Sequence, residues 1–128
     1  MKEIVISANA PAAIGPYSQA VTTGGLVYTS GQLPIDPATG CFPSDNVAEQ
    51  TRQSLLNVKA VLEAAGSGMD KVLKTTVFLR SMEDFGAMNE VYGSFFTEGQ
   101  YPARSAVEAA ALPMGARVEI EAVAERES

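Results

Sequence analysis

Residues 101–125 read YPARSAVEAAALPMGARVEIEAVAE and contain two segments of alternating character, residues 103–110 and 117–125. Alternation with a period of two is typical of β-strands that bury one face. The second segment is predicted to bury Val118, Ile120, Ala122 and Ala124, and to place Arg117, Glu119, Glu121, Val123 and Glu125 on its other face. The charges within these two predicted strands are the first candidates for a functional site.

Arg104 is the candidate anion-binding residue of the first segment. Its neighbours along the strand, Ala103, Ser105 and Ala106, are small, so we expect the guanidinium to lie on a floor of small side chains. A guanidinium is planar and always charged, and it can hold a small carboxylate through two parallel hydrogen bonds. The strand alone is equally compatible with a surface arginine paired with a nearby glutamate.

Glu119 and Glu121 lie two residues apart and therefore share a face of the second predicted strand. Two interpretations are open for these like charges. Both carboxylates face water, or one enters a site and is tuned as a base while the other pairs with a lysine or arginine.

The composition of the 128 residues indicates one domain, residues 1–128, with a modest core. No apolar run is long enough to span a bilayer and no leader-like segment opens the sequence, so we expect a cytoplasmic protein that binds no membrane. The net charge is −6 and the nine Lys and Arg residues are scattered. Nucleic-acid binding, which requires a basic surface, is not expected.

The sequence has no histidine, no tryptophan and one cysteine, Cys41. These absences exclude Ser-His-Asp and Cys-His catalysis, histidine-based metal sites and intrachain disulfides. Cys41 lies in a polar, turn-rich stretch without an activating base, which favours an incidental free thiol. Catalysis must then use carboxylates, Tyr, Ser, Lys, Arg and backbone amides, and we expect no histidine-based metal site.

The rest of the sequence predicts four further strands and two helices. Strands are predicted over residues 2–7, 18–23, 26–30 and 70–80, the second and third joined by a Gly24-Gly25 hairpin turn. One helix is predicted from a capping box at Asn46 to Ala65, and another from a capping box at Ser81 to about Gly99. The second helix is expected to bury Phe85, Met88, Tyr92, Phe95 and Phe96.

Four further residues have both a functional and a structural interpretation. Tyr17 follows the Gly15-Pro16 turn and either presents its hydroxyl to a ligand or packs its ring. Ser30 and Gly31 end a strand, where a glycine allows a ligand close to the backbone or simply forms a turn. Asn89 is a polar contact at an interface or an exposed residue.

The element order predicts an α+β fold, a single mixed six-stranded sheet with two helices on one face. The uncovered face carries apolar residues, so we expect a homo-oligomer. A hairpin of the last two strands would hold Arg104 on the order of 15 Å from Glu119. One short site needs both, so we predict that these strands are not hairpin partners or that the site draws on two subunits.

Four blocks of the sequence together resemble the RidA group of the YjgF/YER057c/UK114 family. They are GPYSQA at 15–20, YTSGQLPIDPATG at 28–40, KTTVFLRSMEDFGAMNEVY at 74–92, and YPARSAVE at 101–108 followed by LPMGARVEIEAVA. The resemblance covers nearly the whole chain. It implies a chorismate-mutase-like subunit, assembled as a homotrimer with ligand sites between subunits.

The resemblance also implies an activity, the cofactor-free hydrolysis of enamine and imine products of pyridoxal-phosphate dehydratases to 2-oxo acids and ammonia. The family's carboxylate-binding arginine falls on Arg104 and its water-activating glutamate on Glu119. The substrate-binding positions fall on Tyr17, Ser30, Gly31, Asn89 and Ala106. Many members have cysteine at the last of these positions, and alanine keeps the backbone N–H but not the thiol.

Two other functions compete with the deaminase. A non-catalytic trimer that binds small carboxylates or acts as a chaperone would use the same Arg104 but has no need of Glu119. An endoribonuclease, an activity attributed to some relatives, is disfavoured by the acidic charge and the lack of histidine.

Overall fold

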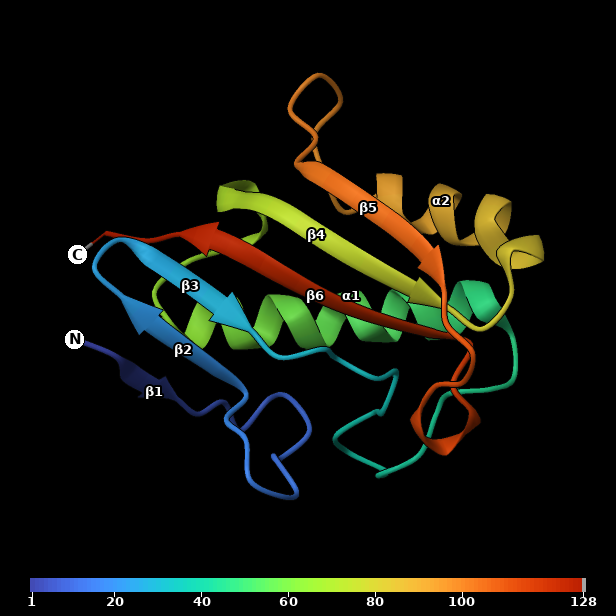
Figure 1. The fold of residues 1–128 in the computed structure, drawn as a ribbon, viewed down its shortest axis with the longest axis horizontal. Coiled ribbons are helices and arrows are strands. Elements are labelled where there is room, and N and C mark those ends of the chain that lie inside the picture. Colours follow the sequence, from blue (N-terminus) through green and yellow to red (C-terminus); the bar gives the residue numbers. More distant parts are fainter. Residues whose placement is uncertain (128) are drawn as a thin grey trace.

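A mixed sheet and two long helices make up the computed structural model, which describes residues 1–127 (Figure 1). The strands are β1 (Glu3–Val5), β2 (Ala20–Thr23), β3 (Leu26–Thr29), β4 (Val72–Leu79), β5 (Ala103–Glu108) and β6 (Val118–Glu125). The helices are α1 (Val47–Ala64) and α2 (Phe85–Gly93), with 3₁₀ turns η1 (Met69–Lys71), η2 (Met82–Asp84) and η3 (Pro113–Gly115). The predicted order of strands and helices is confirmed.

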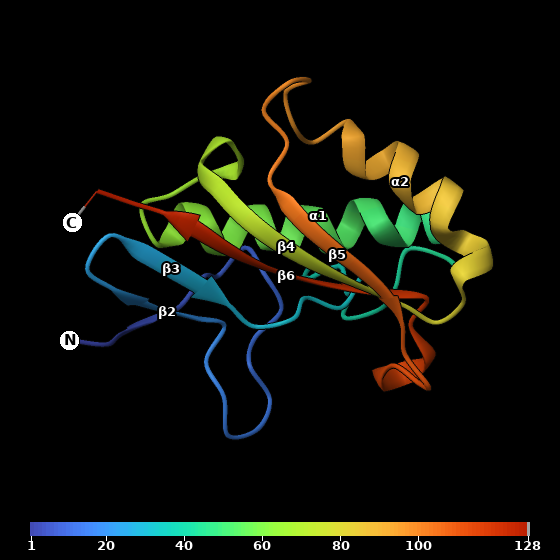
Figure 2. The same cartoon turned by 45° about the horizontal axis from the view of Figure 1, so that its top comes forward.

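The strands form one six-stranded sheet in the order β1-β2-β3-β6-β4-β5 (Figure 1), and Figure 2 shows the same sheet turned by 45°. The β4–β5 pair is parallel and the other pairs are antiparallel. The parallel pair requires a crossover, which α2 supplies. Because β4 lies between β5 and β6, the last two strands are not hairpin partners. This is one of the two alternatives predicted from the distance that a hairpin would place between Arg104 and Glu119.

The predicted hairpin at Gly24-Gly25 is confirmed by the pairing of β2 with β3, in which Thr23 lies opposite Leu26. Gly24 has a φ of 54°, a left-handed conformation that tight hairpin turns require and that glycine adopts without steric cost.

Helix α1 begins as predicted, because the Asn46 side chain accepts a hydrogen bond from the Glu49 amide at 3.1 Å. Its apolar stripe of Leu55, Val58 and Leu62 is fully buried. The predicted length of the second helix was wrong.

Ser81 caps only the short η2, through its hydroxyl and the Glu83 amide at 3.2 Å. Helix α2 then ends at Gly93, a poor helix former, where the Ser94 hydroxyl donates to the Val91 carbonyl at 2.6 Å. Phe95 and Phe96 follow the helix but still pack against the core.

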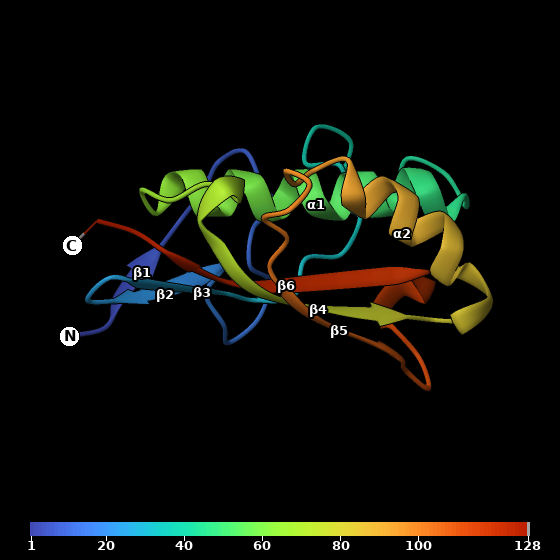
Figure 3. The same ribbon diagram turned by 90° about the horizontal axis from the view of Figure 1, so that it is seen from above.

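Both helices lie on the same face of the sheet, as predicted (Figure 3). Val118, Ile120, Ala122 and Ala124 of β6 point into the core between this face and α1, and all four are buried. The intervening residues Glu119, Glu121 and Val123 therefore point to the opposite face. We call this opposite face the open face, because neither α1 nor α2 covers it. In the described part of the chain, no helix is both long and apolar enough to cross a membrane.

Candidate functional site

A cavity of about 750 Å³ lies beside β6 and includes Glu119. Its walls come from the N-terminal loop, the segment that follows β3, η3 and β6. The lining residues are Pro11, Ala12, Ile14, Tyr17, Gln19, Ser30, Gly31, Gln32, Leu33, Ile35, Pro113, Met114, Glu119 and Glu121. We call this space the glutamate cavity. It brings together four of the predicted site residues, Tyr17, Ser30, Gly31 and Glu119.

Glu119 is half-buried in the glutamate cavity, on the open face of β6. Burial raises the pKa of its carboxyl, and the negative charge of Glu121, two residues along the same face, raises that pKa further. Of the two interpretations of this pair, the structure agrees with a tuned carboxyl at a cavity, but Glu121 lines the same cavity and forms none of the salt bridges found among the described residues, so the expected pairing of the second glutamate with a lysine or arginine is not seen. A carboxylate with a raised pKa is a stronger base than an ordinary glutamate and is suited to accept a proton from water.

Two buried amide side chains hold the loops that form the walls of the glutamate cavity. Gln19 accepts a hydrogen bond from the Ser7 amide at 2.7 Å and donates to the Pro11 carbonyl at 2.8 Å. Asn57 of α1 donates to the Leu33 and Ile35 carbonyls at 3.0 and 2.8 Å. Both loops are therefore fixed by satisfied buried hydrogen bonds, and the cavity is largely formed before any ligand arrives.

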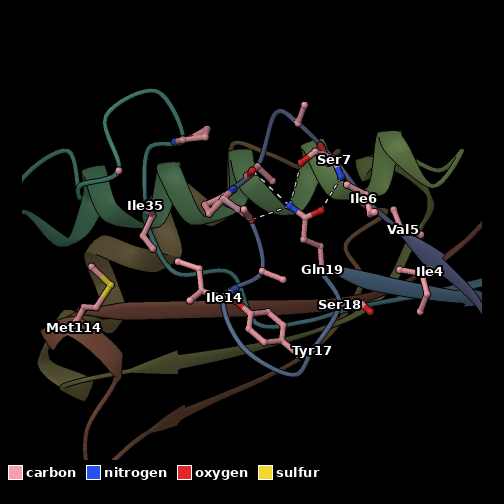
Figure 4. A pocket seen from close by; sticks show the side chains of 17 residues that line it. Ile4, Val5, Ile6, Ser7, Ile14, Tyr17, Ser18, Gln19, Ile35 and Met114 are labelled. Atoms are coloured by element: carbon pink, nitrogen blue, oxygen red, sulfur yellow. Dashed lines mark hydrogen bonds between the residues drawn. The ribbon is translucent and has the colours of Figure 1, made fainter.

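A second cavity of about 770 Å³ adjoins the first beneath the N-terminal loop (Figure 4). The lining residues common to the two cavities are Pro11, Ala12, Ile14, Tyr17, Gln19, Ile35 and Met114. In Figure 4 the Tyr17 ring and the Ile14 side chain lie side by side, with Met114 and Ile35 on the η3 side of the space. An apolar wall thus continues from the neighbourhood of Glu119 under the N-terminal loop.

The hydroxyls of Tyr17 and Ser30 already have partners within the chain. Ser30 Oγ donates to the Ser18 carbonyl at 2.5 Å, so its lone pairs remain able to accept a hydrogen bond. Tyr17 Oη accepts a hydrogen bond from the Ile14 amide at 3.4 Å, and the residue is 53% exposed. Tyr17 is therefore both packed locally and accessible from the cavity.

Arg104 lies on the other face of the sheet, against α2. Its guanidinium carbon is 4.7 Å from the centre of the Tyr92 ring and 5.4 Å from that of Phe85. Arg104 Nη1 also donates to Asn89 Oδ1 at 2.7 Å. The expected floor of small side chains was wrong, because the register of β5 on β4 turns Arg104 toward the helix and its aromatic residues.

The aromatic support of Arg104 is itself anchored. Tyr92 Oη and Thr75 Oγ1 are 2.6 Å apart and both residues are buried. Thr75 of β4 lies opposite Arg104 of β5 in the β4–β5 register, so the strand paired with the one that carries the arginine fixes the ring beneath it. A planar cation stacked on a ring and bonded to an amide loses little further freedom when it binds a carboxylate.

A third cavity, of about 550 Å³, is lined by Asn89, Glu90, Tyr92, Gly93, Tyr101, Pro102 and Arg104. We call it the arginine cavity. Ala106 lies two residues beyond Arg104 on β5, on the helix-facing side, and packs against the core. Asn89, Ala106 and Arg104 thus form a second group of predicted site residues, separate from the first.

The two groups do not meet within one chain. Arg104 is level with Thr75 and Ala122, whereas Glu119 is level with Phe78, three residues along β4. With β4 between them, their Cα atoms are about 14 Å apart, from ~3.3 Å per residue and ~4.8 Å per strand. Their side chains also lie on opposite faces of the sheet. One subunit therefore presents two half-sites rather than one site.

Among the described residues, no three or more His, Cys, Asp or Glu side chains gather in a way that could hold a metal ion. Cys41 is an exposed free thiol, outside the lining of the glutamate and arginine cavities.

The comparisons with known proteins identify the family. A family model described as "Endoribonuclease L-PSP" matches residues 7–126. The chain is also 52% identical over 128 residues to the 2-iminobutanoate/2-iminopropanoate deaminase of Escherichia coli, with 98% of this chain and 99% of that protein covered. The chain belongs to the RidA/YjgF family. The resemblance seen in the sequence is thereby confirmed.

Other RidA/YjgF relatives have less specific names. A protein of Pyrococcus horikoshii named only as a RutC family protein is 50% identical over 127 residues, covering 99% of this chain and 100% of the relative. The crystal structure of the YjgF gene product of Escherichia coli superposes with a TM-score of 0.93 at 50% identity, over 98% of this chain and 99% of that one. The RidA/YjgF fold is therefore shown.

Sequence reasoning missed how the RidA/YjgF half-sites are supported. Tyr92 and Phe85 were assigned only to the core, although they also carry the Arg104 guanidinium. Ile14 and Met114 were not singled out, yet they line the glutamate cavity. The signal for Tyr92 and Phe85 was their spacing around Asn89 on one helix, which required the β4–β5 register to interpret.

Proposed function

We propose that this RidA/YjgF chain is a hydrolytic deaminase that acts without a cofactor on 2-imino acids such as 2-iminobutanoate and 2-iminopropanoate, giving 2-oxo acids and ammonia. The observation that carries the proposal is Glu119, a half-buried carboxyl of raised pKa that lines a preformed cavity. The name of the Escherichia coli relative, at 52% identity over nearly the whole chain, supports this substrate class.

Arg104 is the proposed anchor for the substrate carboxylate. Its guanidinium is oriented by the Tyr92 and Phe85 rings and by Asn89, and it lines an accessible cavity. The Gly31 and Ala106 amides would donate to the substrate beside it. Holding the carboxylate places the adjacent imine carbon in a defined position, which converts a free encounter into a fixed geometry.

Glu119 is the proposed general base. Its carboxylate takes a proton from a water molecule while the water oxygen bonds to C2 of the protonated imine, forming a carbinolamine. The Glu119 carboxyl then returns that proton to the nitrogen, the C2–N bond breaks, the remaining hydroxyl proton is released, and the 2-oxo acid and ammonia leave. Imines hydrolyse unaided, so an acceleration of about 10²–10⁴-fold from one positioned base is sufficient.

The active assembly is proposed to be a homotrimer with each site between two subunits. The two half-sites, which lie on opposite faces of the sheet and in separate cavities of one chain, support a site shared between subunits. The number of three subunits comes from the resemblance to the family. A second copy that packs on the open face would bring its Arg104 to the first copy's Glu119. Tyr28 and Val107, each 44% exposed, supply apolar area on exposed parts of the sheet for such packing.

The proposed substrates are enamines that become imines in water. In the family that the chain resembles, they are released by a pyridoxal-phosphate dehydratase acting on serine or threonine. A cytoplasmic location and a lack of nucleic-acid or membrane partners remain part of the proposal. The test of activity is 2-oxobutanoate release from threonine by such a dehydratase, with semicarbazide competing for the imine. The wild-type protein should accelerate release, and Arg104→Ala should not. Equal rates with and without the wild-type protein would contradict the deaminase.

A mixing experiment tests the shared site. Arg104→Ala and Glu119→Gln subunits, each inactive alone, are unfolded together and refolded. In a head-to-tail trimer, about one quarter of the sites then combine an intact arginine with an intact glutamate, and that share of wild-type activity should return. Sites within one subunit would regain no activity.

A non-catalytic carboxylate-binding module is the competing function, because the oriented Arg104 would bind a carboxylate without turnover. Glu119→Gln separates the two. The deaminase loses turnover and keeps 2-oxobutanoate binding, whereas a binding module shows no turnover before or after the change.

A further inference from the structure

Gly31 lies so close to Glu119 that no side chain fits between them. A Cβ atom built at Gly31 would be 2.7 Å from Glu119 Oε2, 2.9 Å from Cδ and 3.1 Å from Cγ. The first two separations are shorter than Cβ atoms show and the third is a tight contact, so the Glu119 side chain would have to shift. The Glu119 side chain therefore lies directly over the Gly31 backbone.

The backbone conformation of Gly31 does not by itself require glycine. The glycines with positive φ are Gly15, Gly24, Gly40, Gly66, Gly99 and Gly115, and Gly31 is not among them. An alanine could therefore adopt the same backbone at position 31. What excludes alanine there is the Glu119 side chain alone.

The segment that carries Gly31 is fixed to the strand that carries Glu119. The Gln32 amide donates to the Ile120 carbonyl at 2.8 Å, and the Ile120 amide donates to the Gln32 carbonyl at 3.2 Å. Two reciprocal hydrogen bonds between the adjoining residues hold the two backbones in register. If a side chain is added at position 31, the Glu119 carboxyl has to move, because the backbone cannot easily do so.

The charged and titratable groups around Glu119 are few. Within the glutamate cavity they are Tyr17 from the N-terminal loop and Glu121 from β6. On β4, Phe78 and Thr76 lie opposite the two glutamates. The cations nearest to them in sequence on this side are Lys74 of β4 and Arg80, the residue after β4, and the Arg80 guanidinium donates to the Gly115 carbonyl at 2.8 Å.

From this geometry we infer that Gly31 is a positioning residue, whose missing side chain lets the Glu119 carboxyl lie against the backbone inside the cavity. Its effect on turnover rests on the proposed function, but its effect on Glu119 does not. Desolvation at this position is the main cause of the raised pKa of Glu119. The identity of residue 31 thus controls both where the base lies and how strongly it holds a proton.

The test compares Gly31→Ala with the wild-type protein by ¹³C NMR titration of the Glu119 carboxyl, assigned with Glu119→Gln. The added methyl group should push the carboxyl toward water, so its pKa should fall toward that of an ordinary glutamate. Gly68→Ala is the matched control, because a Cβ there would be 2.9 Å from Asp70 Oδ1, outside the three cavities. It should leave the titration of Glu119 unchanged.

Turnover gives the second measurement. A displacement of about 1 Å can cost on the order of 10²-fold, so Gly31→Ala should lose about that much kcat/KM, with the acid limb of its pH profile moved to lower pH. Gly31→Ala/Glu119→Gln should be no slower than Glu119→Gln alone. Additive losses would overturn the inference, because Gly31 would then act independently of Glu119.

If the Gly31→Ala protein folds poorly, its stability can be compared in the wild-type and Glu119→Ala backgrounds. Removing the Glu119 side chain makes room for a methyl group, so Gly31→Ala should destabilise the Glu119→Ala protein less than it destabilises the wild-type protein. Equal destabilisation in both backgrounds, or an unchanged Glu119 pKa in Gly31→Ala, contradicts the positioning role. If the protein lacked deaminase activity, the NMR titration and this stability comparison would still decide the question.

Discussion

The glutamate and arginine half-sites hold their charged groups in opposite ways. Arg104 is placed by favourable contacts, with two aromatic rings below it and an amide oxygen 2.7 Å away. Glu119 is placed by close approach to a backbone and by loss of water, and its ionisation is disfavoured. The comparison indicates that a binding group can stabilise the folded protein, whereas a base whose pKa is raised by burial destabilises it.

The largest expected effect is the loss of the base. Glu119→Gln should lower kcat by about 10²–10⁴-fold, because the amide cannot accept the proton from water. Glu125→Gln, which makes the same charge change at an exposed position on the same strand, is the control and should not alter turnover. Turnover is measured as 2-oxobutanoate release in the coupled dehydratase assay. Full activity of Glu119→Gln would remove the distinction between the two half-sites.

Arg104→Lys should lose about 10–100-fold in kcat/KM, mostly through KM, although the charge is kept. Lysine has no planar fork for a carboxylate and no flat surface to lie on the Tyr92 ring. Arg52→Lys is the matched control, since the Arg52 guanidinium is 5.8 Å from the Phe95 ring and outside the arginine cavity. If Arg104→Lys has the wild-type KM, the point charge alone anchors the ligand.

Tyr92→Phe should reduce stability by about 1–3 kcal/mol, because Thr75 Oγ1 is left buried without its partner. The ring under Arg104 remains, so KM should change little. Urea unfolding and steady-state kinetics measure the two effects, with the exposed Tyr101→Phe as the stability control. A KM that rises tenfold without loss of stability would show that the hydroxyl, rather than the ring, supports Arg104.

The smallest expected effect is a pH-dependent gain in stability. Because the folded protein raises the pKa of Glu119, it binds that proton more tightly than the unfolded chain does, and stability falls as pH rises through the raised value. Glu119→Gln should therefore raise Tm at pH 7. Below the unfolded pKa of glutamate, near pH 4, the gain should vanish. If the gain in Tm persists at pH 3, the cost of ionising the buried Glu119 carboxyl is not its cause.

Much of the fold could be predicted from local patterns. The Gly24-Gly25 turn, the Asn46 cap and the alternation of β6 each depend on neighbours in sequence, and the structure agrees with all three. The end of α2 was predicted too late, because two of the five apolar side chains of the predicted stripe, Phe95 and Phe96, lie past Gly93 and pack on the core from a turn.

The candidate site was harder to predict because it depends on register. Arg104 and Glu119 could be identified as unusual charges, but the faces to which they point follow from the insertion of β4 between β5 and β6. Because of the same register, the guanidinium of Arg104 lies against the Tyr92 and Phe85 rings and not against the small residues that we expected. The close approach of Gly31 to Glu119 joins two segments far apart in the sequence, and no local pattern records it.

The position of β6 in the sheet also matters for synthesis. It is the last strand in the sequence, yet it lies between β3 and β4 and alone joins the β1–β3 meander to the β4–β5 pair. A nascent chain that has emerged only to residue 117 has two unpaired strand edges and neither a finished core nor Glu119. Because only the final strand closes these edges, the C-terminal segment determines when the growing chain stops being prone to edge-to-edge association.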